Sequence, residues 1–391
     1  MAENLVCVAD MRRIAKRRLP RMVFDYLDGA ALDELTLRDN EADIEHLRLR
    51  QRVLQDVSQS HLEVVVLGQR IALPVMIAPM GALTLFHPDA DLILATAAAR
   101  ADTIFVHSAW SGTSLEEVVK VAPNSTWAQI APWKNKEVTR GHVDRAAAAG
   151  VDVLVVAADV SMASKRERDL HHQFDYRARP RFRDMFDSAT NPAWLARFAM
   201  GRKMTYGNYQ IDGRPMRLNE MEQFIHENKN PGSTWKDVEE LRNQWPGKIV
   251  IKGVMTAEDT LHAVRCGVDA VIVSNMGGRH FDAQPSTIAV LPEVVAAADG
   301  RLEVFIDSGI RRGADVAKCL ALGARACFIG RPPVYGLAAR GPVGVDQVFE
   351  FLREELAMTL GNVGLTDVND LDKSVIFRGS EGGLWHPNPR S

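Results

Sequence analysis

The chain has 391 residues, of which 46% are hydrophobic and 25% are charged, and its formal net charge is −3. These values are typical of a globular protein and exclude the overall basic field by which a protein would bind nucleic acid. Its four cysteines, Cys7, Cys266, Cys319 and Cys327, lack CxxC spacing, which argues against a disulfide framework or a zinc site and favours a reducing cytoplasm.

The N-terminus, Met1 to Val6, has no basic segment ahead of an apolar one, so we expect no signal peptide. No apolar run reaches the ~18–20 residues of a transmembrane helix. The sequence therefore predicts a cytoplasmic location and no metal ion.

The first 65 residues are predicted to form an N-terminal helical segment. Helical spacing with charged faces covers about 8–50. Ala9-Asp10 could cap a first helix, and Pro20 opens a second helix that contains Tyr26. The stretch 62–73 has the alternation of a β-hairpin, with its turn at Gly68-Gln-Arg70.

Eight β-branched apolar runs then recur, most of them separated by 20 to 35 residues that include an Ala/Leu-rich helical stretch. Parallel strands that are buried on both faces have this pattern, and eight such strand–helix units predict a closed (β/α)₈ TIM barrel of the α/β class over about 75–360, in one domain spanning 1–391. A doubly wound sheet is the alternative, but Ala78-Pro-Met-Gly81 is a poor Gly-rich turn after the first strand. The runs are Val75–Ala78, Ile104–Val106, Trp127–Ile130, Val153–Val156, Ile249–Ile251, Ala270–Val273, Val304–Ile306 and Cys327–Ile329.

Each run ends on a residue that could bind a ligand or take part in catalysis. Because the carboxyl ends of barrel strands form the active-site face, we expect these residues to surround one site. They are Pro79, Ser108, Gln129, Asp159, Lys252, Ser274, Asp307 and Gly330.

A long insertion follows the fourth strand, since about 90 residues separate Asp159 from Ile249. Its part from about 177 to 232 is rich in Arg, Met, Asn, Pro and Gly and has weak periodicity, so we expect a mobile segment without regular structure. Its mixture of Arg with Phe, Trp and Met suits either a loop over the active site, which we favour, or a monotopic contact with a membrane. The tail, 376–391, is predicted to be poorly ordered.

Three stretches at successive strand ends carry a specific resemblance. They are Ile251-Lys-Gly-Val-Met-Thr-Ala-Glu-Asp259, Ser274-Asn-Met-Gly-Gly-Arg-His-Phe-Asp282, and Ile306-Asp-Ser-Gly-Ile-Arg-Arg-Gly-Ala-Asp315 with Phe328-Ile-Gly-Arg-Pro332. In this order they resemble the FMN-dependent 2-hydroxy-acid oxidases and dehydrogenases, the family of glycolate oxidase, lactate oxidase and mandelate dehydrogenase. The match runs over nearly the whole chain.

The resemblance implies an FMN cofactor and places Lys252 beside the pyrimidine end of the flavin ring. A fixed ammonium there stabilises the negative charge of a reduced flavin. Ser108 and Gln129 match positions that hydrogen-bond the ring. Glycines and arginines match the site of the phosphate and the ribityl chain, where glycines allow close approach and arginines supply positive charge. The residues expected to bind the cofactor are Pro79, Met80, Ser108, Gln129, Lys252, Ser274, Asp307, Gly309, Arg311, Gly330 and Arg331.

The resemblance also implies a small substrate that carries a carboxylate. Arg279 matches the clamp for that carboxylate and Tyr26 matches a second donor to it. Arg166 matches another arginine near the site. Trp110 matches a residue that lines the pocket, although an isolated aromatic residue is as often part of ordinary packing.

Three positions depart from the family pattern. Met276 stands where the family has the histidine that serves as catalytic base, and a thioether takes up no proton at any working pH. Ala131 stands where a tyrosine is usual, so this side of the pocket is larger and more apolar. Asp159 matches the aspartate that orients the missing histidine. Deprotonation would then fall to Asp159, to His280, or to a group of the substrate itself.

We therefore predict an FMN-dependent oxidoreductase that acts on a 2-hydroxy acid or related compound with a bulky apolar side chain, by hydride transfer to flavin N5. The electron acceptor is left open among O₂, a quinone and a carrier protein, and the family suggests a homo-oligomer, often a tetramer. The alternatives are a non-oxidative isomerase or lyase that keeps the flavin, and a flavin-binding protein without activity. Intact Arg279, Tyr26 and Lys252 speak against the last.

Overall fold

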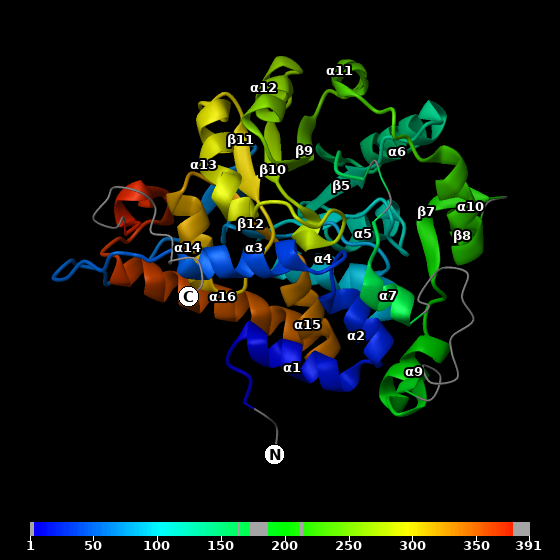
Figure 1. The fold of residues 1–391 in the computed structure, drawn as a ribbon, viewed down its shortest axis with the longest axis horizontal. Coiled ribbons are helices and arrows are strands. Elements are labelled where there is room, and N and C mark those ends of the chain that lie inside the picture. The colour runs from blue at the N-terminus through cyan, green and yellow to red at the C-terminus, as the bar shows by residue number, and fades with distance from the viewer. Residues whose placement is uncertain (1–3, 161, 163, 173–186, 212–213, 378–391) are drawn as a thin grey trace.

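The structure, a computed structural model, describes residues 4–160, 162, 164–172, 187–211 and 214–377. At its centre eight parallel strands pair in chain order and close into a barrel, which confirms the predicted (β/α)₈ fold (Figure 1). All eight predicted runs are strands. They are β3 (Val75–Ile77), β4 (Phe105–His107), β5 (Thr126–Ile130), β6 (Val153–Ala157), β9 (Lys248–Val254), β10 (Ala270–Val273), β11 (Glu303–Ile306) and β12 (Ala326–Ile329).

Helices surround the barrel and cover the outward face of each strand (Figure 1). This arrangement buries the strands on both sides, which is why their sequences are almost continuously apolar. No helix in the described part of the chain is long and apolar enough to cross a membrane. The surrounding helices are α4 (Ala90–Arg100), α5 (Leu115–Val121), α6 (Lys136–Ala148), α11 (Trp235–Gln244), α12 (Ala257–Arg265), α13 (Thr287–Ala298), α14 (Gly313–Ala321), α15 (Arg331–Arg340) and α16 (Pro342–Asn362).

Three aromatic side chains fill the middle of the barrel. The ring centroids of Trp127, Phe305 and Phe328 lie 5.8–6.1 Å apart, and two of the three contacts are edge-on. Such contacts close the barrel interior to water. Phe328 also lines the cavity described below, so this layer forms its floor.

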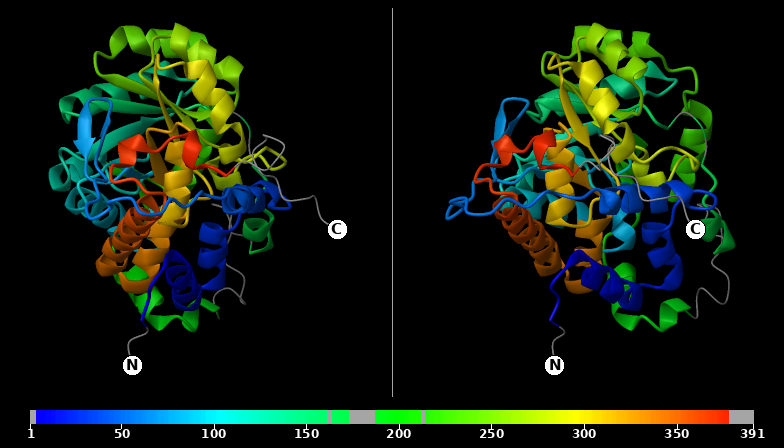
Figure 2. Two further views of the ribbon diagram at one scale, coloured as in Figure 1. Left: turned by 90° about the vertical axis from the view of Figure 1, so that its left-hand side faces the viewer. Right: turned by 60° about the vertical axis from the view of Figure 1, so that its left-hand side comes forward.

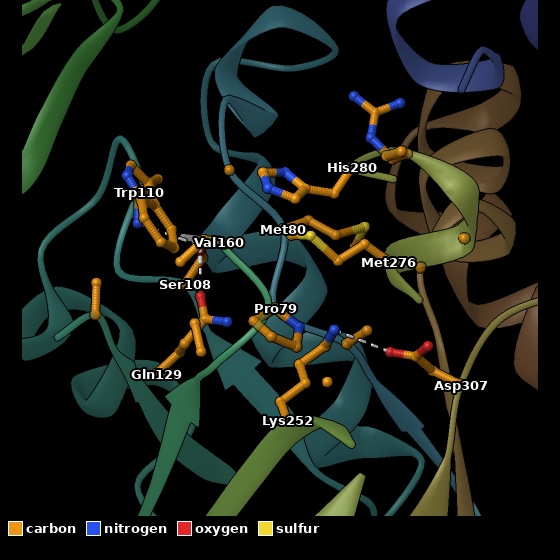
Figure 3. Close-up of a pocket in the computed structure, with 18 of the residues that line it drawn as sticks. Pro79, Met80, Ser108, Trp110, Gln129, Val160, Lys252, Met276, His280 and Asp307 are labelled. Atoms are coloured by element: carbon orange, nitrogen blue, oxygen red, sulfur yellow. Dashed lines mark hydrogen bonds and ion pairs between the residues drawn. The ribbon is translucent and has the colours of Figure 1, made fainter. Parts of the chain in front are cut away.

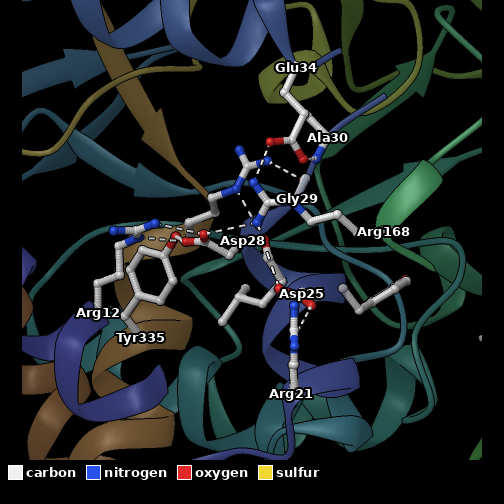
Figure 4. Close-up of polar contacts among 12 residues, drawn as sticks. Arg12, Arg21, Asp25, Asp28, Gly29, Ala30, Glu34, Arg168 and Tyr335 are labelled. Carbon is white, nitrogen blue, oxygen red and sulfur yellow. Dashed lines mark hydrogen bonds and ion pairs between the residues drawn. The ribbon is translucent and has the colours of Figure 1, made fainter. Parts of the chain in front are cut away.

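The N-terminal helices α1 (Val8–Arg18), α2 (Arg21–Asp28) and α3 (Leu35–His46) lie beside the barrel, and α1 packs against α15 (Figure 2). The first helix begins at Val8, where helical spacing was predicted to begin, but its N-cap residue is Cys7 and the predicted cap at Ala9-Asp10 was wrong. Asp28, at the end of α2, is buried and accepts hydrogen bonds from Arg12 Nε at 2.6 Å and Tyr335 Oη at 2.7 Å (Figure 4). This cluster joins α1, α2 and α15.

The predicted hairpin is present as β1 (Val64–Val66) and β2 (Gln69–Ile71), but its turn is at Leu67-Gly68. Placing Gln69 and Arg70 in the turn was wrong. Leu67 and Gly68 have φ of 49° and 86°, as a two-residue hairpin turn requires, and Gln69 and Arg70 belong to the second strand.

The insertion after β6 contains α7 (Glu167–His171), α9 (Pro192–Met200), the hairpin β7 (Thr205–Ile211) and β8 (Arg214–Arg217), and α10 (Leu218–Asn228). The expectation of a segment without regular structure was wrong for its described part. Its short elements are stabilised by buried side chains, although the segment as a whole has weak periodicity. The buried residues are Trp194, Tyr206, Tyr209, Met216 and Met221. Residues 173–186 and 212–213 lie outside the described residues.

The C-terminal segment continues through α16, η3 (Val368–Asp370) and η4 (Lys373–Val375). Ile376 is buried and pairs with Leu49, and Phe377 N donates to Arg48 O at 2.8 Å. The prediction of poor order was therefore wrong for Ile376 and Phe377. Residues 378–391 lie outside the described part of the chain.

Candidate active site

A cavity of about 680 Å³ opens at the carboxyl ends of the barrel strands, in the size range of small-molecule sites. All the predicted site residues line it except Asp159 and Ser274, whose side-chain oxygens lie 3.8 and 2.6 Å from the Nζ of the lining residue Lys252. Side chains that the sequence separates by 200 residues, such as Pro79 and Met276, point into the same space (Figure 3). The predicted active-site face is therefore a single concave site.

Lys252, on β9, is the buried cation at the bottom of this cavity. Its Nζ donates to Ser274 Oγ at 2.6 Å and lies 3.3 Å from Asp307 Oδ2 and 3.8 Å from Asp159 Oδ2. Burial opposes the charge, but the two carboxylates outweigh it and raise the pKa of Lys252 above its usual value. The site therefore holds a fixed ammonium, and Ser274 positions it from behind.

Ser108 and Gln129 lie on neighbouring strand ends and are joined by a hydrogen bond. Ser108 Oγ donates to Gln129 Oε1 at 3.2 Å, and the pair lines the cavity near Pro79 (Figure 3). Asn208 of β7 donates to the main-chain oxygen of Ser108 at 3.1 Å. The insertion thus braces this wall of the site, a contact that the sequence did not reveal.

The ends of β11 and β12 form one corner of the cavity, lined by Gly309 and Gly330. Gly309 has a φ of 84°, and a Cβ there would lie 2.2 Å from Asn40 O of α3, so only glycine fits. At Gly330 a Cβ would meet only Met80 Sδ at 3.6 Å, which leaves room for a ligand against the main chain at the start of α15.

Arg311 and Arg331 supply positive charge to this corner, but both also hold protein groups. Arg311 Nη2 pairs with Glu41 Oε1 at 2.7 Å. Arg331 is buried, which lowers its pKa to about 10, and it donates to the main-chain oxygens of Leu27, Gly29 and Gly277 at 2.8–3.2 Å. Arg331 therefore also fixes the end of α2 over the site.

Two guanidinium groups contact one aromatic ring at the cavity wall. Arg279 and Arg166 lie 5.0 and 5.1 Å from the ring centroid of Tyr26, within the range of cation–π contacts. Arg279 Nη1 also donates to Tyr26 O at 2.7 Å and Gly29 O at 3.0 Å, and Arg166 Nε pairs with Asp169 at 3.0 Å. Both positive charges remain at the surface of the cavity, where they can attract a carboxylate.

Met276 occupies a strained turn after β10. Its φ is 53°, and Gly277 and Gly278 follow with φ of 62° and 74°. Left-handed backbone is unusual for methionine and is often found at functional sites. A Cβ at Gly278 would lie 2.7 Å from Leu37 N of α3, so the turn also lets α3 approach the site.

His280 projects into the cavity from the same loop (Figure 3), and its Nε2 is buried without a hydrogen-bond partner in the described structure. Burial lowers the pKa of His280, the charge of Lys229 lowers it further, and the charge of Asp159 raises it. His280 is therefore a neutral imidazole within reach of the charges around the site.

Asp159 differs from its expected state. The histidine that it would orient is replaced by Met276, and its carboxylate lies within ion-pair distance of Lys252 instead. Its oxygens are buried and accept no hydrogen bond from the described residues, and burial raises the pKa of its carboxyl group. Of the two candidate bases, His280 lines the cavity and Asp159 does not.

Several lining residues were missed at the sequence level, among them Trp133, Tyr206 and Lys229. Trp133 and Tyr206 pack in one buried cluster with Ala131 and Tyr209, and Trp110 contacts Trp133 edge-on. The two tyrosines of this strand, Tyr206 and Tyr209, are three residues apart, so the sequence lacks the strict alternation that indicates a strand. Ala131 is thus surrounded by aromatic side chains, most of them distant in sequence.

The profile of a family described as FMN-dependent dehydrogenase matches residues 15–378. The chain belongs to this family. Within it, the chain is 38% identical over 371 residues to an L-lactate oxidase from a Nostoc species, covering 94% of this chain and 96% of that protein. It is 36% identical over 371 residues to an (S)-mandelate dehydrogenase from Pseudomonas putida, covering 95% and 93%.

A solved structure of this fold is described as monotopic membrane protein (S)-mandelate dehydrogenase. It aligns with a TM-score of 0.92 and 35% identity over 96% of this chain and 100% of that one. This FMN-dependent dehydrogenase is therefore an oxidoreductase of the 2-hydroxy-acid oxidase and dehydrogenase type. The comparisons support that prediction and give no support to an isomerase or lyase.

The residues present fit FMN. The open space at Gly330, the helix start at α15 and the charges of Arg311 and Arg331 suit its phosphate. Lys252, Ser108 and Gln129 provide a buried cation and polar groups for the ring. The deep cavity over the aromatic floor is apolar enough for a flat ring system.

Proposed function

We propose that the protein oxidises a 2-hydroxy acid with a bulky apolar side chain, with His280 as the base in place of the histidine that the family has at position 276. The observation that carries the first part is the contact of Arg279 and Arg166 with the ring of Tyr26 at 5.0 and 5.1 Å. Two cations beside one phenol form a site for a planar carboxylate.

Bound FMN supplies the acceptor for the hydride equivalent that leaves the carbon next to the carboxylate. Arg279, Arg166 and Tyr26 hold the carboxylate and so fix that carbon in place. Lys252 provides positive charge at the bottom of the site, where its neighbours Asp307 and Asp159 keep it protonated.

His280 accepts the proton of the substrate hydroxyl at Nε2. This atom has no hydrogen bond to give up in the described structure, and the lowered pKa keeps it unprotonated near neutral pH. As the imidazolium forms, the charge of Asp159 stabilises it, since that charge favours the protonated ring. Asp159 is therefore a positioning and electrostatic residue in this proposal.

The apolar side of the cavity sets the size of the substrate side chain. Met80, Met276 and Ala131 line this side with thioether and methyl groups. At positions 131 and 276 the family has polar side chains instead. Trp110 and Tyr206 add aromatic surface. A phenyl or branched alkyl side chain would bury apolar area there, at roughly 25 cal/mol per Å². Lactate and glycolate would leave this surface uncovered.

The test is anaerobic mixing of the yellow holoenzyme with a panel of 2-hydroxy and 2-amino acids of increasing side-chain size. We expect loss of the flavin absorbance with 2-hydroxy acids, fastest for aromatic or branched ones. If carboxylates bind without any loss of absorbance, oxidation of such acids is not the function.

We also propose that α9 contacts a membrane surface. Leu195, Phe198 and Met200 are 41%, 40% and 80% exposed on this nine-residue helix. Exposed apolar side chains on an interfacial helix insert into the headgroup region. Flotation with liposomes tests this: the wild type should float and Phe198→Ser/Met200→Ser should not, whereas failure of both to float contradicts the proposal.

Cytoplasmic location, the electron acceptor and a homo-oligomeric state stay predictions.

A further inference from the structure

Six lysine and arginine residues of the described part of the chain line the cavity, and five of them have a role in the proposed function. Lys252, Arg311 and Arg331 suit the cofactor, and Arg166 and Arg279 suit the carboxylate of the substrate. The sixth is Lys229, which comes from the insertion. Lys229 is half-buried and lines the cavity, so its ammonium group is accessible to a ligand there.

Lys229 is held at the cavity by the end of α10. Its main-chain N–H donates to Ile225 O at 2.9 Å, and the preceding residue, Asn228, accepts from Lys134 N at 2.8 Å, which ties α10 to the loop after β5. The loop that follows contributes Asn230 and Ser233 to the same wall. The position of Lys229 is thus set by the barrel.

No carboxylate partner is available to Lys229 within the described part of the chain. Partial burial is the one cause that lowers its pKa, and no ion pair or side-chain hydrogen bond joins it to a described residue. Lys229 and His280 line the same cavity, and the charge of Lys229 lowers the pKa of that imidazole. Val160 and Ile225 add apolar surface to the same cavity.

We propose that Lys229, with Asn230 beside it, binds a second anionic group at the far end of the substrate side chain. The substrate class is then a 2-hydroxy acid that carries a carboxylate at each end of an apolar spacer. This inference rests on the proposed function, because one carboxylate is taken to bind at Arg279 and Arg166. An ammonium beside an amide suits a carboxylate that has left water.

The test compares matched substrates that differ only at the far end, mandelate against 4-carboxymandelate and 2-hydroxyoctanoate against 2-hydroxyoctanedioate. We expect the diacid of at least one pair to have a kcat/KM about tenfold higher in the wild type. Lys229→Met should remove most of that ratio and Lys229→Arg should keep it. Lys236→Met, an exposed lysine on α11 that does not line the cavity, is the matched control.

Binding of inert analogues provides a second readout that needs no turnover. The Kd of 4-carboxyphenylacetate relative to phenylacetate, followed by the flavin spectrum, should rise in Lys229→Met and stay unchanged in Lys236→Met. If Lys229→Met lowers kcat/KM equally for both members of each pair and leaves the Kd ratio unchanged, Lys229 only tunes His280 and the inference is wrong. If no acid is oxidised at all, the proposed function fails while the Kd ratio still decides the role of Lys229.

Discussion

The ammonium of Lys252 lies 3.8 Å from the carboxylate of Asp159. This ion pair engages the aspartate that would otherwise be the obvious substitute for a missing histidine base. A carboxylate that must balance a buried ammonium is poorly placed to take a proton from the substrate. His280 is therefore the better candidate for the base, because its Nε2 is buried and has no hydrogen-bond partner in the described structure.

Replacing His280 by glutamine should lower kcat by about 10²–10⁴-fold, the usual contribution of a general base. Glutamine keeps much of the volume and the polarity, so the affinity for inert carboxylates should hold. Stopped-flow measurement of anaerobic flavin reduction gives the rate, and titration with phenylacetate gives the Kd. A loss of less than fivefold would show that another group takes the proton.

The pH profile gives an independent check on the same residue. Burial, the largest effect, lowers the pKa of His280 below 6.5, and the base acts in its neutral form. Activity should thus persist below pH 6.5 and fall only as the pH drops through this lowered pKa. Removing the charge of Lys229, which also lowers the pKa, should move the acid limb of kcat/KM to higher pH. No movement of the limb would contradict the assignment of His280.

A histidine at position 276 should substitute for His280. The left-handed φ of 53° at Met276 is tolerated by histidine better than by most residues. We expect Met276→His/His280→Gln to recover at least tenfold of the flavin reduction rate lost in His280→Gln alone. Equal rates in the single and double variants would mean that Met276 does not stand at a base position.

The site proposed for the substrate carboxylate can be tested with a variant that keeps the positive charge at position 279. Arg279→Lys loses the planar fork that a carboxylate matches and should lower kcat/KM by about 10–100-fold, as expected for about 1.5–3 kcal/mol of charged hydrogen bonding. Because Arg279 also donates to Tyr26 O and Gly29 O, the thermal midpoint is measured alongside. A normal kcat/KM in Arg279→Lys would place the carboxylate elsewhere.

Gly309 should be irreplaceable for steric reasons. Alanine there adds a Cβ 2.2 Å from Asn40 O at a φ of 84°, whereas Gly300 has a similar φ of 68° and open space around it. Gly300→Ala should cost about 1 kcal/mol of folding free energy, and Gly309→Ala clearly more, with loss of bound flavin. Similar denaturation midpoints and flavin content in the two variants would show that α3 can move away from the site.

The sequence predicted the eight strands because each is buried on both faces, and it predicted most of the cavity because Lys252, Asp307 and Gly330 follow those strands directly. It did not predict the contacts made by the insertion. Tyr206 and Lys229 reach the site only through the packing of β7 and α10 against the loop after β5, and such long-range contacts leave no local pattern. The pairing of Asp159 with Lys252 likewise depends on two neighbouring strands whose register the sequence does not give.

The measurement that tests the central claim most directly is anaerobic reduction of the bound flavin by an aromatic 2-hydroxy acid, protonated or deuterated at C2, in the wild type and in His280→Gln. We expect reduction of the wild type with a primary isotope effect, and reduction at least 10²-fold slower in the variant. Absence of reduction in the wild type, or equal rates in the two proteins, would contradict it.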